Sequence, residues 1–228
     1  MKEFWNSLVK LGFKLLYNEL AWTYDLVSWL ASRGQWRAWQ QTAIPFLSGE
    51  LVLELAHGPG HMLLALESAG FQVVGLDLSP FMGKQARKKI ENLRDRIALV
   101  RGSGQMLPFK QETFDSVLST FPTEFLAKVE TIISVHRVLK PGGCLVIVPQ
   151  ARFTGTGPVT RFLEWLYAIT GQRPKTQEVE RGPFWQQVRT RFENAGFGIE
   201  IKVVAVKSSD VTVVIARKQQ EALAVPKK

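Results

Sequence analysis

The stretch LVLELAHGPG at residues 51–60 decides the fold of this chain. Its first half places one carboxylate, Glu54, among apolar residues, a pattern typical of a short strand that helices cover on both faces. Gly58, Pro59 and Gly60 then turn the chain with very little side chain. Because glycine has no Cβ, a ligand can approach the backbone closely there. The stretch therefore predicts a buried strand that ends at a ligand-binding turn.

The same order of strand, turn and helix repeats along the chain. Strands are expected at 51–56, 72–79, 97–103, 114–121 and 144–149, with a turn at 141–143, and helices at 61–70, 80–93 and 125–139. The strands are short, apolar and rich in β-branched residues. This composition indicates a parallel sheet with helices on both faces.

A strand pair follows the helix expected at 184–197. Its two strands, 199–206 and 210–217, are joined by only three residues. Parallel strands need a crossover connection of about a dozen residues or more. The last strand must therefore run antiparallel, and the fold class is α/β with a mostly parallel sheet and a reversed last strand.

The chain divides into an N-terminal helical arm (1–46), a main domain (47–217) and a flexible tail (218–228). The arm carries helices near 23–31 and 36–46 and five of the seven tryptophans: Trp5, Trp22, Trp29, Trp36 and Trp39. Tryptophan suits packed cores and membrane interfaces alike, and cover over a pocket is favoured here. Residues 150–183 interrupt the strand–helix order around an aromatic helix near 159–169, so we expect this insertion to form a substrate wall.

Composition limits the possible partners. One cysteine among 228 residues fits a reducing compartment, and with only three histidines no metal site is expected. The net charge of +9 fits nucleic acid, an anionic membrane face or an anionic small molecule. The basic run at 84–96 lacks interleaved aromatics, so a solvated helix face is favoured there and no nucleic acid is expected. No run approaches the roughly 20 apolar residues of a membrane span. We expect a cytoplasmic protein, with the inner membrane face as the alternative.

Ligands of open parallel sheets bind beyond the carboxyl ends of the strands. The loops at these ends carry Gly58 and Gly60 after the first strand and Asp77 after the second, where an acid can accept hydrogen bonds from ribose hydroxyls. This combination fits NAD, FAD or S-adenosylmethionine. Leu63 stands where the dinucleotide fingerprint has its third glycine, which disfavours a dinucleotide.

The ordered segments VLELAHGPG, GLDLS, GSGQMLPF, FDSVLSTF and HRVLKPGGCLVIV resemble the class I S-adenosylmethionine-dependent methyltransferases over roughly residues 51–217. The segment YDLVSWLASRGQWRAWQ at 24–40 is similar to the leading segment of the ubiquinone/menaquinone C-methyltransferases, in the methyltransferase type 11 group. Phospholipid N-methyltransferases share a looser version of it. The resemblance implies a Rossmann-like sheet of seven strands with the last one reversed, and S-adenosyl-L-methionine as cofactor.

The resemblance also implies roles for single residues. Glu54 matches an acid that helps to hold the methionine ammonium, often through water, and Asp77 matches the acid that binds the ribose. Gly58 and Gly60 match glycines beside the methionine and ribose, with Ala56 in place of the usual first glycine. Leu78 matches a residue that lies against the adenine ring, and Ser119 matches a residue near the methionine end of the cofactor. Ser103 and Gly104 match the position at the adenine edge. Because serine is short, Gln105 could make the adenine contact in its place.

Three residues are candidates for proton transfer. His57 is either a proton acceptor beside the methyl donor or a structural residue of the turn, and the structural role is favoured. Tyr24, with Asp25, could reach the site if the arm folds over it, or could pack in the core. Glu124 could act as a base or lie on an exposed turn. His61 is expected to face solvent, and His136 to cap or pack in the core.

These features together favour methyl transfer to an apolar or lipid-like acceptor, either a quinol precursor or a phospholipid head group. The tryptophan-rich arm would supply walls for the acceptor, and positive charge beside it could favour an anionic membrane surface. Two alternatives stay open. One is a soluble small-molecule acceptor with the arm as a simple lid, and the other is a cofactor-binding protein without catalysis. The acceptor atom and the oligomeric state do not follow from the sequence.

Overall fold

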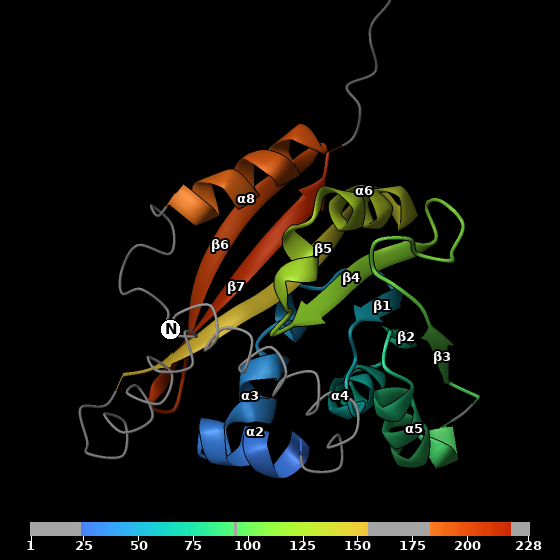
Figure 1. Ribbon diagram of the computed structural model, residues 1–228, viewed down its shortest axis with the longest axis vertical. Helices are drawn as coiled ribbons and strands as arrows, with labels where there is room; N and C mark the ends of the chain where they lie inside the picture. The colour runs from blue at the N-terminus through green and yellow to red at the C-terminus, as the bar shows by residue number, and fades with distance from the viewer. Residues whose placement is uncertain (1–23, 94, 155–182, 220–228) are drawn as a thin grey trace, which may run out of the picture.

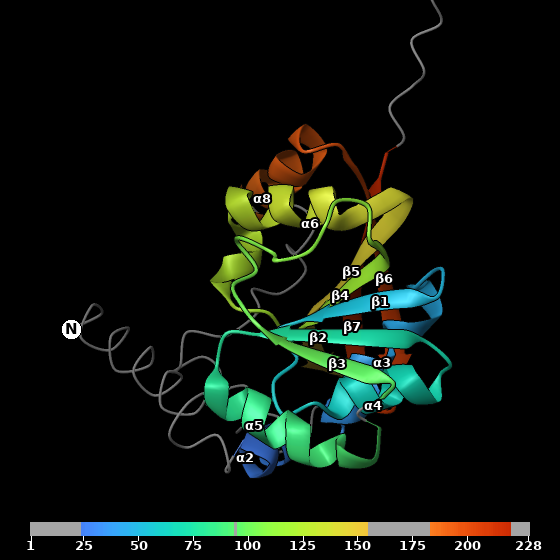
Figure 2. The same ribbon diagram turned by 90° about the vertical axis from the view of Figure 1, so that its right-hand side faces the viewer.

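A computed structural model describes residues 24–93, 95–154 and 183–219. Its centre is a seven-stranded sheet of order β3-β2-β1-β4-β5-β7-β6 (Figures 1 and 2). The strands are β1 (Leu51–Leu55), β2 (Gln72–Asp77), β3 (Ile97–Arg101), β4 (Phe114–Thr120), β5 (Leu139–Phe153), β6 (Phe197–Val206) and β7 (Ser209–Lys218).

The pairing of the strands confirms the predicted topology. The first five strands pair in parallel, β1 with β2 and β4, β2 with β3, and β4 with β5. β7 runs antiparallel to both β5 and β6, so it alone is reversed. The link before it is a tight turn in which Lys207 has a φ of 51°. So short a link permits only an antiparallel pair.

Helices cover both faces of the sheet, as buried parallel strands require. In Figures 1 and 2 the helices α3, α4 and α5 lie below the sheet and α6 and α8 above it. One apolar cluster joins the lower helices to the sheet through Met62, Leu63 and Ala86, and the other joins the upper helices through Ile132 and Phe192. The helices are α2 (Tyr24–Ser32), α3 (Trp36–Gln41), α4 (His61–Ser68), α5 (Pro80–Lys89), α6 (Val129–Val138) and α8 (Pro183–Asn194), with 3₁₀ helices η2 (Ile44–Phe46), η3 (Glu91–Leu93) and η4 (Glu124–Ala127).

β5 differs most from the sequence prediction. It begins before the turn expected at 141–143. That turn lies within β5 as a register shift in its pairing with β4, between the pair Phe114 and Leu139 and the pair Ser116 and Cys144. It also continues to Phe153, whose partner on β7 is Ser209. The expectation that residues 150–153 belong to the insertion is therefore wrong. The aromatic helix expected near 159–169 lies outside the described residues.

The arm packs against the main domain at several points. Asp25 on α2 binds His61 and Lys89, and Gln40 on α3 donates a hydrogen bond from Nε2 to Thr120 Oγ1 at 2.8 Å. Trp39 is buried and meets Phe153 edge to face. These contacts place α2 and α3 near the carboxyl ends of the strands. No helix within 24–93, 95–154 and 183–219 is long and apolar enough to cross a membrane.

Candidate active site

A cavity of about 360 Å³ lies at the carboxyl ends of the central strands. Ala56 and Gly58 line it after β1, Asp77 and Leu78 at the end of β2, residues 102–105 after β3, and residues 120–123 with Phe125 after β4. The structure thus brings together seven predicted cofactor residues: Ala56, Gly58, Asp77, Leu78, Ser103, Gly104 and Gln105. Glu54, Gly60 and Ser119 are not among the lining residues.

The turn after β1 has an unusual backbone. Ala56, Gly58 and Gly60 have φ values of 56°, 56° and 85°, in the left-handed region that favours glycine. A Cβ on Gly60 would lie 2.9 Å from the Cβ of Ala86, so this glycine allows the turn to pack on α5. A Cβ on Gly58 would meet nothing within 4 Å. Gly60 therefore serves packing, while Gly58 keeps open the space beside the cavity.

Asp77 fixes the turn to the end of β2. Its Oδ2 accepts a hydrogen bond from the Gly58 amide at 2.9 Å, and its Oδ1 accepts one from the Ser79 amide at 2.8 Å. A carboxylate offers about four lone-pair positions. Two backbone amides therefore orient Asp77 and leave it acceptor capacity for hydroxyl groups of a ligand in the cavity.

Glu54 is a buried acid without a complete set of partners. Glu54 is only 1% exposed, and its Oε2 atom has no hydrogen-bond partner among the described residues. Burial, and secondly the negative charge of Asp77, raises the pKa of Glu54 well above its usual value. An unpaired buried carboxyl is costly. A nearby cation or a bridging water would satisfy it, and the ammonium of S-adenosylmethionine fits this need.

The opposite end of the cavity is more apolar. Leu78 is 66% exposed at its edge, and a Cβ on Gly104 would lie 3.0 Å from a ring carbon of Phe125. Ser103 accepts a hydrogen bond on its Oγ from the Gln105 amide at 3.2 Å. This end can hold a flat ring between apolar side chains. Ser119 is instead fully buried and donates from Oγ to the Leu55 carbonyl at 3.1 Å, which ties β4 to β1.

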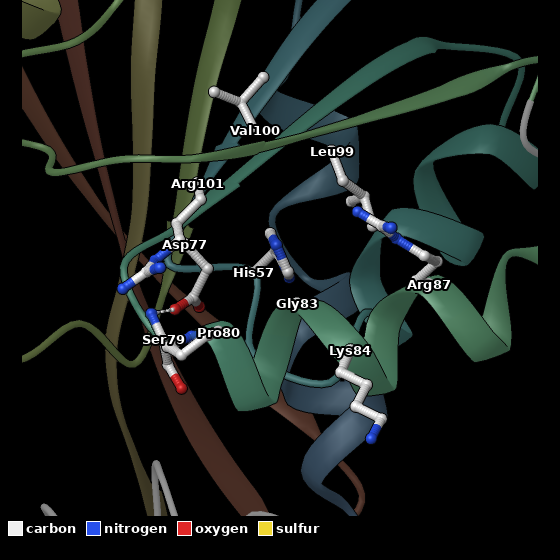
Figure 3. Close-up of a pocket in the computed structure, with 10 residues that line it drawn as sticks. All are labelled: His57, Asp77, Ser79, Pro80, Gly83, Lys84, Arg87, Leu99, Val100 and Arg101. Carbon is white, nitrogen blue, oxygen red and sulfur yellow. Dashed lines mark hydrogen bonds between the residues drawn. The ribbon is translucent and has the colours of Figure 1, made fainter.

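His57 is not among the residues that line this cavity. It lines a second cavity of about 280 Å³ beside α5, with Lys84, Arg87 and Arg101 (Figure 3). Its Nδ1 lies 2.7 Å from the Gly58 carbonyl oxygen, and burial lowers the pKa of the imidazole. Because His57 is buried and bonded within the turn, its geometry favours the structural alternative.

The other candidate bases differ in their surroundings. Glu124 begins η4 at an exposed position and does not line the cavity. Tyr24 is the first residue of α2, but the structure describes only its backbone. His136 packs edge to face on Phe197, as a core role predicts. His61 was expected to face solvent, and this is wrong, since its side chain is 13% exposed and binds Asp25. The sequence gives no signal for that pair, which forms only when α2 folds against α4.

Known proteins resemble this chain in sequence. Residues 53–147 match the family model of a methyltransferase domain. The demethylmenaquinone methyltransferase of Lactiplantibacillus plantarum is 32% identical over 203 residues, which cover 80% of this chain and 86% of that protein. The demethylmenaquinone methyltransferase of Symbiobacterium thermophilum is 26% identical over 232 residues, covering 90% and 92%.

Solved structures share the fold. The geranyl diphosphate C-methyltransferase of Streptomyces coelicolor, in complex with S-adenosyl-L-homocysteine, is 13% identical with a TM-score of 0.57, covering 79% of this chain and 78% of that one. A SAM-dependent methyltransferase from Aquifex aeolicus is 20% identical with a TM-score of 0.55, covering 79% and 89%.

The fold and the relatives together define a class, the Rossmann-like methyltransferases that use S-adenosyl-L-methionine. Within that class, the chain belongs to the ubiquinone/menaquinone C-methyltransferase-like family.

Proposed function

We propose that this enzyme methylates a ring carbon of a quinol precursor that carries an apolar chain. The observation that carries the proposal is the aromatic contact between the arm and the cavity. Trp36 of α3 stacks on Phe121 with 4.1 Å between ring centroids, and Phe121 lines the cavity. The relatives named above are demethylmenaquinone methyltransferases, so a quinol fits better than a phospholipid head group.

The described residues fit the methyl donor. When bound, S-adenosylmethionine supplies a sulfonium methyl that is already a strong electrophile. Asp77 would accept the ribose hydroxyls, and Leu78 and Phe125 would lie against the adenine ring. Glu54 would balance the methionine ammonium, directly or through water. Gly58 leaves the space that this contact with backbone requires.

The arm would exclude water from the reacting groups. Trp36, Trp39 and Phe121 form a cluster with centroid distances of 4.1 to 6.3 Å beside the cavity. Gln40 holds this cluster to Thr120 at the end of β4. A dry, fixed pocket aligns a nucleophile with the methyl group and lowers the entropic cost of transfer.

We also propose that α2 contacts an anionic membrane surface. Leu26 and Leu30 are 60% and 56% exposed and lie one helical turn apart on α2. The basic helix α5 lies beside α2 in Figure 2, and the pair between Lys89 and Asp25 joins the two helices. Apolar side chains beside cations suit the headgroup region of an anionic bilayer.

Transfer of a labelled methyl group tests the proposal. Purified enzyme would receive methyl-labelled S-adenosylmethionine with either demethylmenaquinol in vesicles or a soluble naphthoquinol that lacks the chain. We expect label mainly in the chain-bearing product. Preference for the soluble ring would support the small-molecule alternative, and cofactor binding without any transfer would support the non-catalytic one.

Vesicle flotation tests the membrane contact separately. We expect the wild-type protein to float with phosphatidylglycerol vesicles and to stay behind with neutral ones. Leu26→Ser with Leu30→Ser should abolish flotation. Val203→Ser, at an exposed valine of β6, is the matched control and should leave flotation unchanged. Equal flotation of all variants would contradict a contact through α2.

A further inference from the structure

A third cavity, of about 320 Å³, lies between α2, α3 and the start of α4. Asp25, Trp29, Trp36, Arg37 and His61 line it. It adjoins the cofactor cavity, because Trp36 lines the one and stacks on Phe121, which lines the other. The two cavities therefore meet at this aromatic pair, and His61 directly follows the glycine turn of the cofactor site.

His61 and Asp25 form a hydrogen-bonded pair in this cavity. His61 Nε2 lies 2.8 Å from Asp25 Oδ1, and Lys89 Nζ lies 3.0 Å from Asp25 Oδ2. A carboxylate can only accept, so His61 donates from Nε2. In the neutral ring, this tautomer leaves the lone pair on Nδ1. Within the described part of the chain, Nδ1 makes no hydrogen bond.

The surroundings of His61 favour its neutral form by lowering its pKa. Burial lowers its pKa most, and the positive charges of Lys89 and Arg37 lower it further, against the opposing effect of Asp25. His61 is also the first residue of α4, where the helix dipole disfavours a positive charge. The lone pair on Nδ1 is therefore available near neutral pH.

We propose that this cavity receives the hydroxylated ring of the acceptor, and that His61, oriented by Asp25, accepts the proton of a ring hydroxyl on Nδ1. This inference rests on the proposed function. The tryptophan side chains of the cavity can pack against an aromatic ring. The neutral imidazole of His61 can accept the proton of a phenol, and the cation of Arg37 can stabilise the phenolate that results.

The proton and electron balance is complete. The ring O–H bond breaks, its proton goes to Nδ1, and its electron pair moves into the ring. The activated ring carbon forms a bond to the methyl group as the methyl–sulfur bond breaks, with that electron pair staying on sulfur. The hydrogen on the methylated carbon then leaves as a proton to water, while His61 returns its proton to the ring oxygen. One proton is released overall, and His61 ends neutral.

A structural role for the same pair is the main alternative, since it also fastens α2 to α4. His61→Gln separates the two roles, because the glutamine amide can donate to Asp25 in place of Nε2 but cannot act as a base. We expect kcat to fall about 100-fold, as loss of a general base predicts. KM and S-adenosylmethionine affinity should stay within about two-fold. His136→Gln changes a histidine packed on Phe197 and should retain full kcat.

The pH profile and NMR give readouts that a structural role would not move. In the wild-type enzyme kcat/KM should fall as pH drops through the ionisation of His61, and this limb should be missing in His61→Gln. Nuclear magnetic resonance of the cofactor-free protein should show His61 protonated on Nε2, and 1-naphthol should shift its Nδ1 signal but not those of His136.

The outcomes are distinct from those of the proposed function. Full activity of His61→Gln on the quinol, or no effect of 1-naphthol on His61, would overturn this inference and leave the quinol assignment standing. If the wild-type enzyme does not methylate the quinol yet 1-naphthol shifts His61, the proposed acceptor is wrong and the ring site is supported.

Discussion

The Oδ2 atom of Asp77 lies 2.9 Å from the amide nitrogen of Gly58. This bond connects the ends of two neighbouring parallel strands, because Gly58 follows β1 and Asp77 ends β2. The acid therefore serves two purposes. It holds the backbone of the turn in its left-handed conformation, and it presents its remaining lone pairs to the cavity.

Asp77→Ala should weaken binding of S-adenosylhomocysteine by about 100-fold, because it removes charged hydrogen bonds worth about 1.5 to 3 kcal/mol each. Asp115→Ala is the matched control. Asp115 also accepts two backbone hydrogen bonds, from Glu50 at 3.2 Å and Leu51 at 2.9 Å, but at the far end of β1. It should lower the melting temperature and leave the affinity unchanged. Calorimetric titration of both variants checks this, and equal loss in both would contradict the assigned role.

Glu54→Gln should stabilise the cofactor-free protein at pH 8. The pKa of Glu54 is raised in the folded state. The contribution of Glu54 to the free energy of unfolding is therefore complete below the pKa of the unfolded state, and it is lost as pH rises through the pKa of the folded state. The stabilisation by glutamine should therefore be small at pH 4.5 and larger at pH 8. Thermal unfolding at both values measures it. The same variant should bind S-adenosylmethionine about 10-fold to 100-fold more weakly. A variant that is no more stable at pH 8 would contradict the buried, unpaired acid.

The two glycines of the turn should respond differently to alanine. Gly60→Ala forces a left-handed alanine against Ala86 and should cost about 2 to 4 kcal/mol, the sum of backbone strain and overpacking. Gly58→Ala meets open space, so it should cost only about 1 to 2 kcal/mol. Gly70→Ala, also left-handed and open, controls for strain alone. Urea unfolding measures the order of stability of the three variants. Gly58→Ala should also lose affinity for the cofactor, whereas Gly70→Ala should keep it.

Trp36 and Phe121 should be energetically coupled. They stack at 4.1 Å with an interplanar angle of 25°, and such pairs contribute about 0.5 to 1.5 kcal/mol beyond burial. A double-mutant cycle with Trp36→Leu and Phe121→Leu should show this coupling in unfolding free energy. The single variants should also lower kcat by admitting water. Additive effects in the cycle would mean that the arm does not close on the cavity through this pair.

Much of the fold could be predicted because local patterns decide it. The short link before β7 dictates an antiparallel pair, and apolar strands dictate helices on both faces. The sequence predicts that β5 ends at Pro149, because residues 150–183 interrupt the order of strands and helices. The structure places the register shift between Ile147 and Gln150, so Pro149 falls at an irregularity and the strand continues. Only the partner strand reveals this.

The site was predictable where one loop carries its own signal. Gly58 and Gly104 follow strand ends, Asp77 is the last residue of β2, and the topology brings these ends together. Phe125 was not predicted as a site residue, because it lies in an apolar run that is typical of a helix packed in the core. Its contact with Gly104 joins two separate loops, and no local pattern indicates such a contact. The pair of His61 with Asp25 joins residues 36 positions apart. Long-range packing of α2, which no local pattern specifies, creates it.

A crystal structure with S-adenosylhomocysteine tests the central claim most directly. We expect the ribose hydroxyls on the Asp77 carboxylate, the adenine ring between Leu78 and Phe125, and the homocysteine chain along Gly58. Electron density for the nucleoside in the basic cavity beside His57 and Arg87 (Figure 3), or an Asp77 carboxylate out of reach of the ribose, would contradict the account.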